Sequence, residues 1–205
     1  MRFLSSIEKQ WGFLAVPNLT LHWVLGQILV YGISLLRPGL LEHFLLIPQS
    51  VLDGEVWRMA AFLLAPPLLT GHPLFLLVIW YWFWVLGSEL EELMGDFRYS
   101  VFMLTNILAT VGLSFFEPVS LYSNAFILSS VFLAFAFMKP DREVLLCFIL
   151  PVKFKWLAGA MWLSYGYILL IGPAWSERFM VMAVALTFLL FFGRDIWLIL
   201  RQLVR

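Results

Sequence analysis

The sequence has little cysteine, histidine or charge, and each shortage excludes a class of function. Its one cysteine, Cys147, cannot form an internal disulfide, and the chain has no CxxC pair for a redox dithiol or a thiolate zinc site. The 13 Lys and Arg residues balance the 13 Asp and Glu residues, so no excess of positive charge favours nucleic acid as a partner. The three histidines, His22, His43 and His72, include no i, i+4 pair, and we expect no metal or other cofactor.

Apolar surface, by contrast, is abundant. The sequence is 62% hydrophobic and 18% aromatic, with a mean hydropathy of +0.93, which does not fit a soluble surface. A helix needs about 20 mostly apolar residues to cross the hydrocarbon of a bilayer. We therefore expect an all-α integral membrane protein with six transmembrane helices. The predicted crossings are residues 19–36, 74–87, 99–116, 121–138, 157–171 and 179–200.

The segments outside these crossings predict the rest of the architecture. Residues 1–17 carry apolar side chains at helical spacing and predict an amphipathic helix on the membrane surface, ahead of a transmembrane domain over residues 18–205. The long connection 38–73, interrupted by prolines and glycines, should fold onto the membrane surface between helices 1 and 2. The segment 88–95, which is rich in Glu, should continue the second helix into solvent, and residues 144–156 should re-enter the membrane interface.

The basic residues predict which side each loop occupies. With six crossings, ten of them fall on one side and three on the other, and cytoplasmic loops are the ones that collect Lys and Arg. Both termini are therefore expected in the cytoplasm, and a bacterial inner membrane is favoured over the endoplasmic reticulum. The ten are Arg2, Lys9, Arg98, Lys139, Arg142, Lys153, Lys155, Arg194, Arg201 and Arg205, and the three are Arg37, Arg58 and Arg178.

Three short motifs occur in a distinctive order. Residues 54–58 read Gly-Glu-Val-Trp-Arg in the long connection, and Gly87, Glu91 and Gly95 follow at steps of four at the end of the second span. A Lys-Pro-Asp turn at 139–141 then precedes a Pro-Val-Lys-Phe-Lys-Trp segment. Over residues 51–156 this order resembles the rhomboid superfamily. The resemblance implies a rhomboid-like bundle of six helices with the long membrane-surface loop between helices 1 and 2.

Active rhomboids are intramembrane serine proteases with a serine on the fourth span, a histidine on the sixth and an oxyanion His and Asn pair on the second. The resemblance places Ser123 at the serine position, the histidine position near Met182, and Phe75 and Ile79 at the oxyanion pair. A serine hydroxyl needs an adjacent base and preorganised donors to attack an amide. The chain therefore resembles the non-catalytic, pseudoprotease branch, which includes the derlins, and we expect no enzyme.

Other residues of the motifs suggest structural roles. Trp57 and Arg58 should fasten the loop, because an indole prefers the membrane interface and a guanidinium can bond several carbonyls; the alternative is direct contact with a client. Polar residues in the third and fourth spans predict hydrogen bonds between helices. The alternative, raised by the resemblance, is a lateral groove for a client helix with Asn106, Ser123 and Asn124 as polar contacts.

Together these patterns predict a non-catalytic, rhomboid-like protein that binds or handles transmembrane segments of other membrane proteins in quality control, chaperoning or assembly. Its expected partners are those membrane proteins and the lipid bilayer. The short apolar stretches 74–86 and 157–171 favour local thinning of the bilayer. Two alternatives stay open: a structural accessory subunit of a larger membrane complex, and a residual intramembrane serine protease that uses Ser123.

Overall fold

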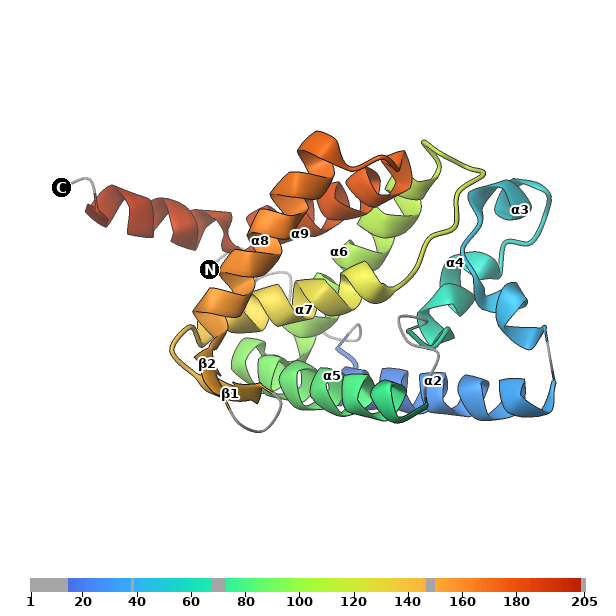
Figure 1. Cartoon of the computed structure of the whole chain (residues 1–205), viewed down its shortest axis with the longest axis horizontal. Coiled ribbons are helices and arrows are strands. Elements are labelled where there is room, and N and C mark those ends of the chain that lie inside the picture. The colour runs from blue at the N-terminus through green and yellow to red at the C-terminus, as the bar shows by residue number, and fades with distance from the viewer. Residues whose placement is uncertain (1–14, 38, 68–72, 147–149, 204–205) are drawn as a thin grey trace.

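The computed structural model describes residues 15–37, 39–67, 73–146 and 150–203, so the predicted helix over 1–17 lies mostly outside the described residues. Six longer helices dominate the described chain (Figure 1). They are α2 (Leu19–Leu36), α5 (Pro73–Met94), α6 (Asp96–Ser114), α7 (Ala125–Met138), α8 (Phe154–Ile171) and α9 (Trp175–Leu203). The loop between α2 and α5 contains η2 (Leu40–Phe44), α3 (Pro48–Leu52), α4 (Arg58–Ala61) and η3 (Phe62–Leu64). Strands β1 (Glu143–Leu146) and β2 (Leu150–Lys153) lie between α7 and α8.

Four of the longer helices are long and apolar enough to cross a membrane. They are α2, α5, α8 and the part of α9 up to Leu198. This agrees with the composition and indicates an integral membrane protein. Helix α7 has only 14 residues and is about 21 Å long, shorter than the roughly 30 Å of bilayer hydrocarbon. Helix α6 has 19 residues but carries several polar side chains, so length and composition alone support four crossings rather than the predicted six.

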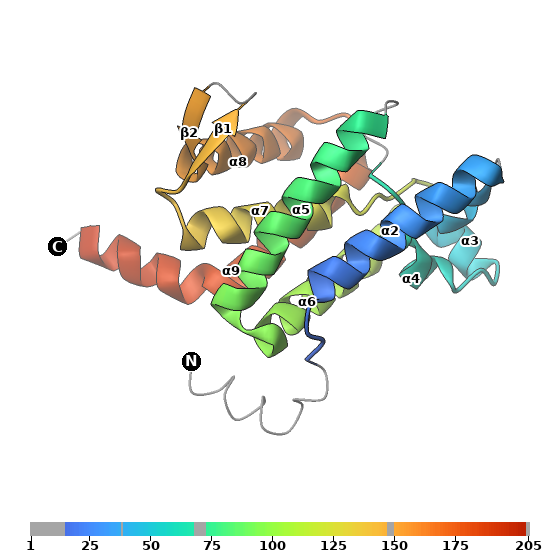
Figure 2. The ribbon, with the colours of Figure 1, turned by 90° about the horizontal axis from the view of Figure 1, so that it is seen from below.

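Helices α6 and α7 are the inner helices of the bundle. Helix α6 packs along α9, and α7 packs against both α5 and α9. Helices α2 and α5 run side by side, and α8 packs on α7 and α9 (Figure 2). Six residues of α7 from Ile127 to Phe135 are at most 1% exposed. Helix α7 is too short and α6 too polar to count as a crossing by length and composition. These are also the two helices that the rest of the protein surrounds most completely.

Successive longer helices run in alternate directions, so their ends gather at two opposite ends of the bundle (Figure 1). At one end α5 finishes, α6 begins, α7 finishes and the β1–β2 hairpin leads into α8. Gly95 makes the turn from α5 to α6 at a φ of 84°, a conformation that favours glycine. Arg142 pairs there with Glu89 of α5. We call this the basic end, and the opposite one, which holds the segments η2 to η3, the loop end.

The predicted all-α class needs one amendment, because residues 143–153 form an antiparallel hairpin at the basic end. Pro151 is tolerated in β2, since both strands of an isolated hairpin are edge strands. Next to the hairpin, the Lys155 ammonium lies 2.7 Å from an Asp141 oxygen, and this hydrogen bond lowers the pKa of Asp141. Helix α8 begins at Phe154, directly after β2 and earlier than the predicted Leu157.

The fourth helix begins later than the sequence predicted. Residues 121–124 are not helical, because the backbone of Tyr122 pairs with the loop through a bridge to Leu46. The Tyr122 amide donates to the Leu46 carbonyl at 2.9 Å. Helix α7 starts only at Ala125, whose amide donates to the hydroxyl oxygen of Ser123 at 3.0 Å.

Candidate functional site

Arg58 connects separate parts of the loop. Its side chain is buried, with 7% of the residue exposed, and one guanidinium nitrogen donates to the backbone carbonyls of Glu42 and Leu45. A second nitrogen forms an ion pair with Glu55. A guanidinium has five donors and can satisfy carbonyls that no regular element pairs. These are the contacts that a loop-fastening role requires. Trp57 is 52% exposed and is therefore accessible to the membrane interface.

A second polar centre lies at the backbone carbonyl of Leu63 in η3. This carbonyl accepts hydrogen bonds from the Trp23 indole, from the Gln27 side-chain amide at 2.9 Å and from the Asn124 amide at 3.1 Å. The Gln27 oxygen in turn accepts from the Trp80 indole at 2.9 Å. Gln27 is fully buried. One carbonyl of the loop is thus bound to α2 and to the start of α7, and through Gln27 to α5.

Asn124 satisfies more of the loop backbone than the Leu63 carbonyl alone. Its Nδ2 atom also lies 3.1 Å from the Phe62 carbonyl and 2.8 Å from the Ala65 carbonyl. The residue is 2% exposed, so these carbonyls have little access to water. In apolar surroundings an unpaired carbonyl is costly. Asn124 supplies a donor to the Ala65 carbonyl and adds a second one at the Phe62 carbonyl, which also accepts from the Ala65 amide at 3.2 Å.

The three residues of the predicted client groove do not form one polar lining. Ser123 is exposed and lines a cavity of about 180 Å³ together with Asn124. Asn106 is not among the residues that line this cavity, and its amide donates to the Phe102 carbonyl in its own helix at 2.9 Å. The amides of Asn106 and Asn124 both bind carbonyls of the chain itself, so Ser123 is the exposed member of the three.

Glu91 is buried rather than solvated, contrary to the prediction for the acidic extension. It is 4% exposed, and its Oε1 atom accepts a hydrogen bond from the Leu19 amide at 3.0 Å. Leu19 is the first residue of α2, where amides lack partners within the helix and the helix dipole favours negative charge. Glu91 therefore binds the start of α2.

Gly87 allows α5 to approach α2 and α6 closely. A Cβ atom at this position would lie 2.5 Å from the Thr20 methyl carbon and 3.1 Å from the Tyr99 hydroxyl oxygen. Those two side chains are themselves hydrogen-bonded to each other at 2.7 Å. The helices could therefore accommodate a larger residue only by separating or by breaking this contact.

We expect Gly87→Ala to lower the stability of the folded protein in detergent by about 1 to 3 kcal/mol, the usual cost of overpacking a well-packed interior. The midpoint of thermal unfolding measures this. Gly159→Ala in α8 is the matched control, since a Cβ there meets no atom within 4 Å. An equal loss in both variants would show that helical glycine itself, and not the close approach, matters at Gly87.

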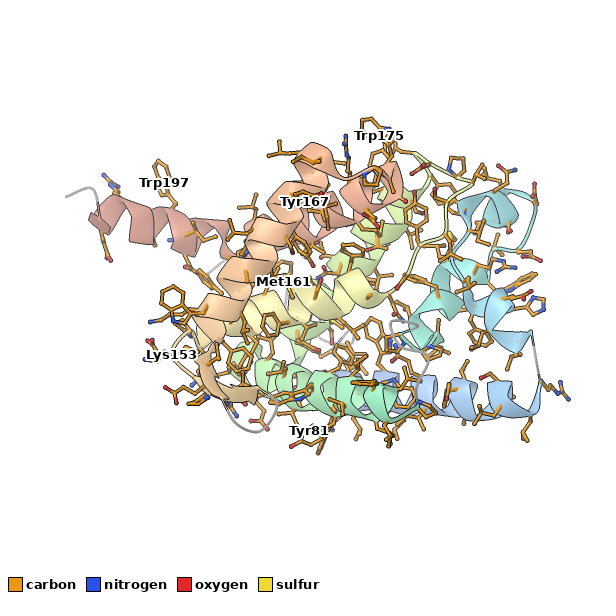
Figure 3. The ribbon with its side chains drawn as sticks, in the orientation of Figure 1. Tyr81, Lys153, Met161, Tyr167, Trp175 and Trp197 are labelled. Atoms are coloured by element: carbon orange, nitrogen blue, oxygen red, sulfur yellow. The ribbon has the colours of Figure 1, made fainter. Side chains whose placement is uncertain are left out.

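A lateral cleft of about 350 Å³ lies between α5 and α8. Both helices pack on α7 but make little direct contact with each other, so α7 forms the floor of the cleft. Only 11% of the residues in the apolar stretch of α8 are buried, against 33% in α5, so α8 is the more loosely held wall. The lining comprises Ile79, Trp82, Phe83 and Leu86 of α5, Ala125, Leu128, Ser129, Val131 and Phe132 of α7, and Met161 of α8, which Figure 3 labels.

The cleft is almost wholly apolar. Its one hydroxyl belongs to Ser129, which donates to the Phe126 carbonyl at 2.7 Å and bonds the Tyr165 hydroxyl of α8. The arrangement suits an apolar segment better than a reaction that needs a nucleophile and a base. Among the described residues, no group of three His, Cys, Asp or Glu side chains could hold a metal ion.

No protein-family model, curated protein or solved structure matches this chain. The rhomboid resemblance of the motifs therefore stays a prediction, and the geometry of the described residues carries the interpretation.

Sequence reasoning did not locate the α5–α8 cleft or the network at Leu63. The cleft consists of ordinary apolar residues whose neighbours in space come from three separate helices. Gln27 gave a partial signal, because a buried amide within an apolar span needs a partner. The structure shows these partners to be Trp80 of α5 and the Leu63 carbonyl.

Proposed function

We propose that this chain is a non-catalytic, rhomboid-like membrane protein that binds transmembrane segments of other membrane proteins in the α5–α8 cleft. The observation that carries the proposal is a lateral, almost wholly apolar cleft whose wall α8 is weakly buried. A client helix could enter from the side by displacing α8, without breaking the Leu63 network. Such handling fits a role in quality control, chaperoning or assembly.

Six crossings with both termini in the cytoplasm fit this proposal best. The alternating helices give the short α7 and the polar α6 the directions that two further crossings need. Exposed tryptophans occur towards both ends, as at membrane interfaces: Trp156 and Trp197 towards the basic end, and Trp57 and Trp175 towards the loop end. Figure 3 shows Trp175 and Trp197 projecting from the bundle. A bacterial inner membrane remains the favoured location.

The two apolar stretches that predicted bilayer thinning lie in helices of 22 and 18 residues, α5 and α8, so we propose thinning at the shorter helix α7 instead. Helix α7 is about 21 Å long and forms the floor of the cleft, so lipid that reaches the cleft meets a helix shorter than the bilayer hydrocarbon. A polar residue of a client has less hydrocarbon to cross in a thinned bilayer, which lowers the cost of moving it. The cleft floor is formed by this short helix, so thinning would occur where the client enters.

The environment of Ser123 is the reason why the proposed function does not include proteolysis. Its hydroxyl oxygen accepts the Ala125 amide, and neither described histidine binds it. His22 instead bonds the Asn18 carbonyl at 2.8 Å in its own first turn. A hydroxyl without an adjacent base stays a weak nucleophile.

Photocrosslinking tests the proposal. A photoreactive residue at Ile79 or Met161, both in the cleft, should capture other membrane proteins in native membranes. Leu163 is the matched control, because it lies within one helical turn of Met161 on a different face and is 78% exposed. Ser123→Ala should leave the captured products unchanged.

Three outcomes would contradict the proposal. Equal capture from Leu163 would show that the cleft has no special role. Captured proteins that are cleaved by the parent but stay intact with Ser123→Ala would indicate a residual protease. One stoichiometric partner captured from every position would indicate an accessory subunit of a larger complex.

A further inference from the structure

A second cavity, of about 340 Å³, lies at the basic end, where α5, α6, α7 and α9 meet. It is separate from the α5–α8 cleft and has a different character. Two arginines, Arg98 of α6 and Arg194 of α9, line it together with one carboxylate, Asp195. The remaining lining residues are apolar: Leu93, Met94, Met138, Leu190, Phe191 and Phe192.

Within the described chain, neither cavity arginine has a hydrogen-bond or ion-pair partner. Asp195 lines the same cavity but lies beyond ion-pair distance of both guanidinium groups. Other arginines of the chain do bind internal acceptors: Arg142 pairs with Glu89, and Arg178 donates to the Gly172 carbonyl at 2.8 Å. The two cavity guanidiniums therefore keep their donors available, and with Asp195 they give the cavity a net positive charge.

We propose that this cavity binds the headgroup phosphate of an anionic phospholipid, with an acyl chain against the apolar wall formed by Leu190 and Phe191. A guanidinium matches the geometry of phosphate oxygens and can bind two of them at once. Basic pockets between transmembrane helices, at the end that carries the positive charge, are typical sites for such headgroups. This inference is independent of the client cleft.

The position of the cavity favours a lipid over a soluble phosphate compound. Beyond Arg194, α9 continues out of the bundle, and Trp197 on this extension is 64% exposed (Figures 1 and 3). An exposed indole prefers the depth of lipid headgroups. The two guanidiniums therefore lie close to the level at which lipid phosphates are found, and the apolar walls continue from there along α9.

Lipid-dependent stability of the full chain tests the proposal. Added phosphatidylglycerol should raise the midpoint of thermal unfolding of the detergent-purified protein more than phosphatidylcholine does. Arg98→Gln and Arg194→Gln should each weaken the apparent affinity for phosphatidylglycerol about fivefold, since each removes one positive charge near the headgroup. Arg201→Gln is the matched control, because Arg201 is an exposed arginine on the same helix outside the cavity.

Asp195→Asn provides a test of opposite sign. Removing this carboxylate should tighten phosphatidylglycerol binding, which an unfolded or misfolded variant cannot do. Neither arginine substitution leaves a described protein group unpaired, so both variants should unfold at the parental temperature in phosphatidylcholine.

Three results would overturn the proposal. Equal stabilisation by the two lipids would show that the headgroup charge has no role. Equal weakening by Arg201→Gln would show that the effect belongs to the surface charge of α9 and not to the cavity. Equal stabilisation by inorganic phosphate alone would show that the ligand is a free anion and not a lipid.

Discussion

An Asn124→Ala protein should unfold in detergent at a much lower temperature than the parent. The substitution removes the donor shared by the carbonyls of Phe62, Leu63 and Ala65. Each buried polar group left without a partner costs about 1 to 3 kcal/mol. The Leu63 carbonyl keeps its bonds from α2 and the Phe62 carbonyl keeps the Ala65 amide, so we expect a loss of about 2 to 3 kcal/mol, mainly from the Ala65 carbonyl.

Two further variants separate lost hydrogen bonding from lost packing. Asn124→Asp keeps the size of the side chain but has no amide donor, so it should destabilise the protein at least as much as alanine does. Asn106→Ala removes a buried asparagine that donates to one carbonyl within its own helix, and should cost only about 1 kcal/mol. If Asn124→Asp were as stable as the parent, the three carbonyl contacts would not be what holds the loop.

Replacing Arg58 by alanine should produce the second large loss of stability, of about 3 kcal/mol. The Glu42 and Leu45 carbonyls lose their guanidinium donor, and the Glu55 carboxylate loses its partner. Arg58→Lys should recover only part of the loss, because one ammonium cannot reproduce the planar set of donors. Thermal unfolding in detergent measures all of these effects.

Trp57→Ala is the control for the Arg58 prediction, since it changes the neighbouring residue of the same motif. Half of this residue is exposed, so its loss should change the unfolding temperature in detergent far less than the loss of Arg58. An Arg58→Ala protein that unfolds at the parental temperature but no longer captures clients would show that the motif is a client-contact surface and not a fastening for the loop.

The helices were predictable to the extent that apolar runs end at clear breaks. Arg37 stops α2, and Gly95 separates the end of α5 from α6, as the prediction of an acidic helical extension required. The start of α7 was predicted wrongly, because Leu121 and Tyr122 continue the apolar run and nothing local shows that their backbone pairs with the loop. The same limit applies to the hairpin, whose apolar strand residues are equally compatible with an interfacial segment.

The polar contacts were less predictable, because each depends on a partner far away in sequence. Arg58 could be assigned a fastening role from its chemistry, but its acceptors could not be named. Glu91 and Leu19 are separated by 72 positions, and only the packing of α5 on α2 brings them together. An acidic helix end is usually exposed to solvent, and this expectation is wrong for Glu91.

The carbonyl of Leu63 also constrains the order of events during synthesis. Its donors on α2, Trp23 and Gln27, leave the ribosome before it, whereas Asn124 is made 61 residues later. The loop can therefore begin to dock on α2 early but cannot complete its hydrogen bonds until the start of α7 has been made. Until then, the Ala65 carbonyl lacks the donor that Asn124 supplies, so this end of the loop should stay within reach of water until the second half of the protein has been made.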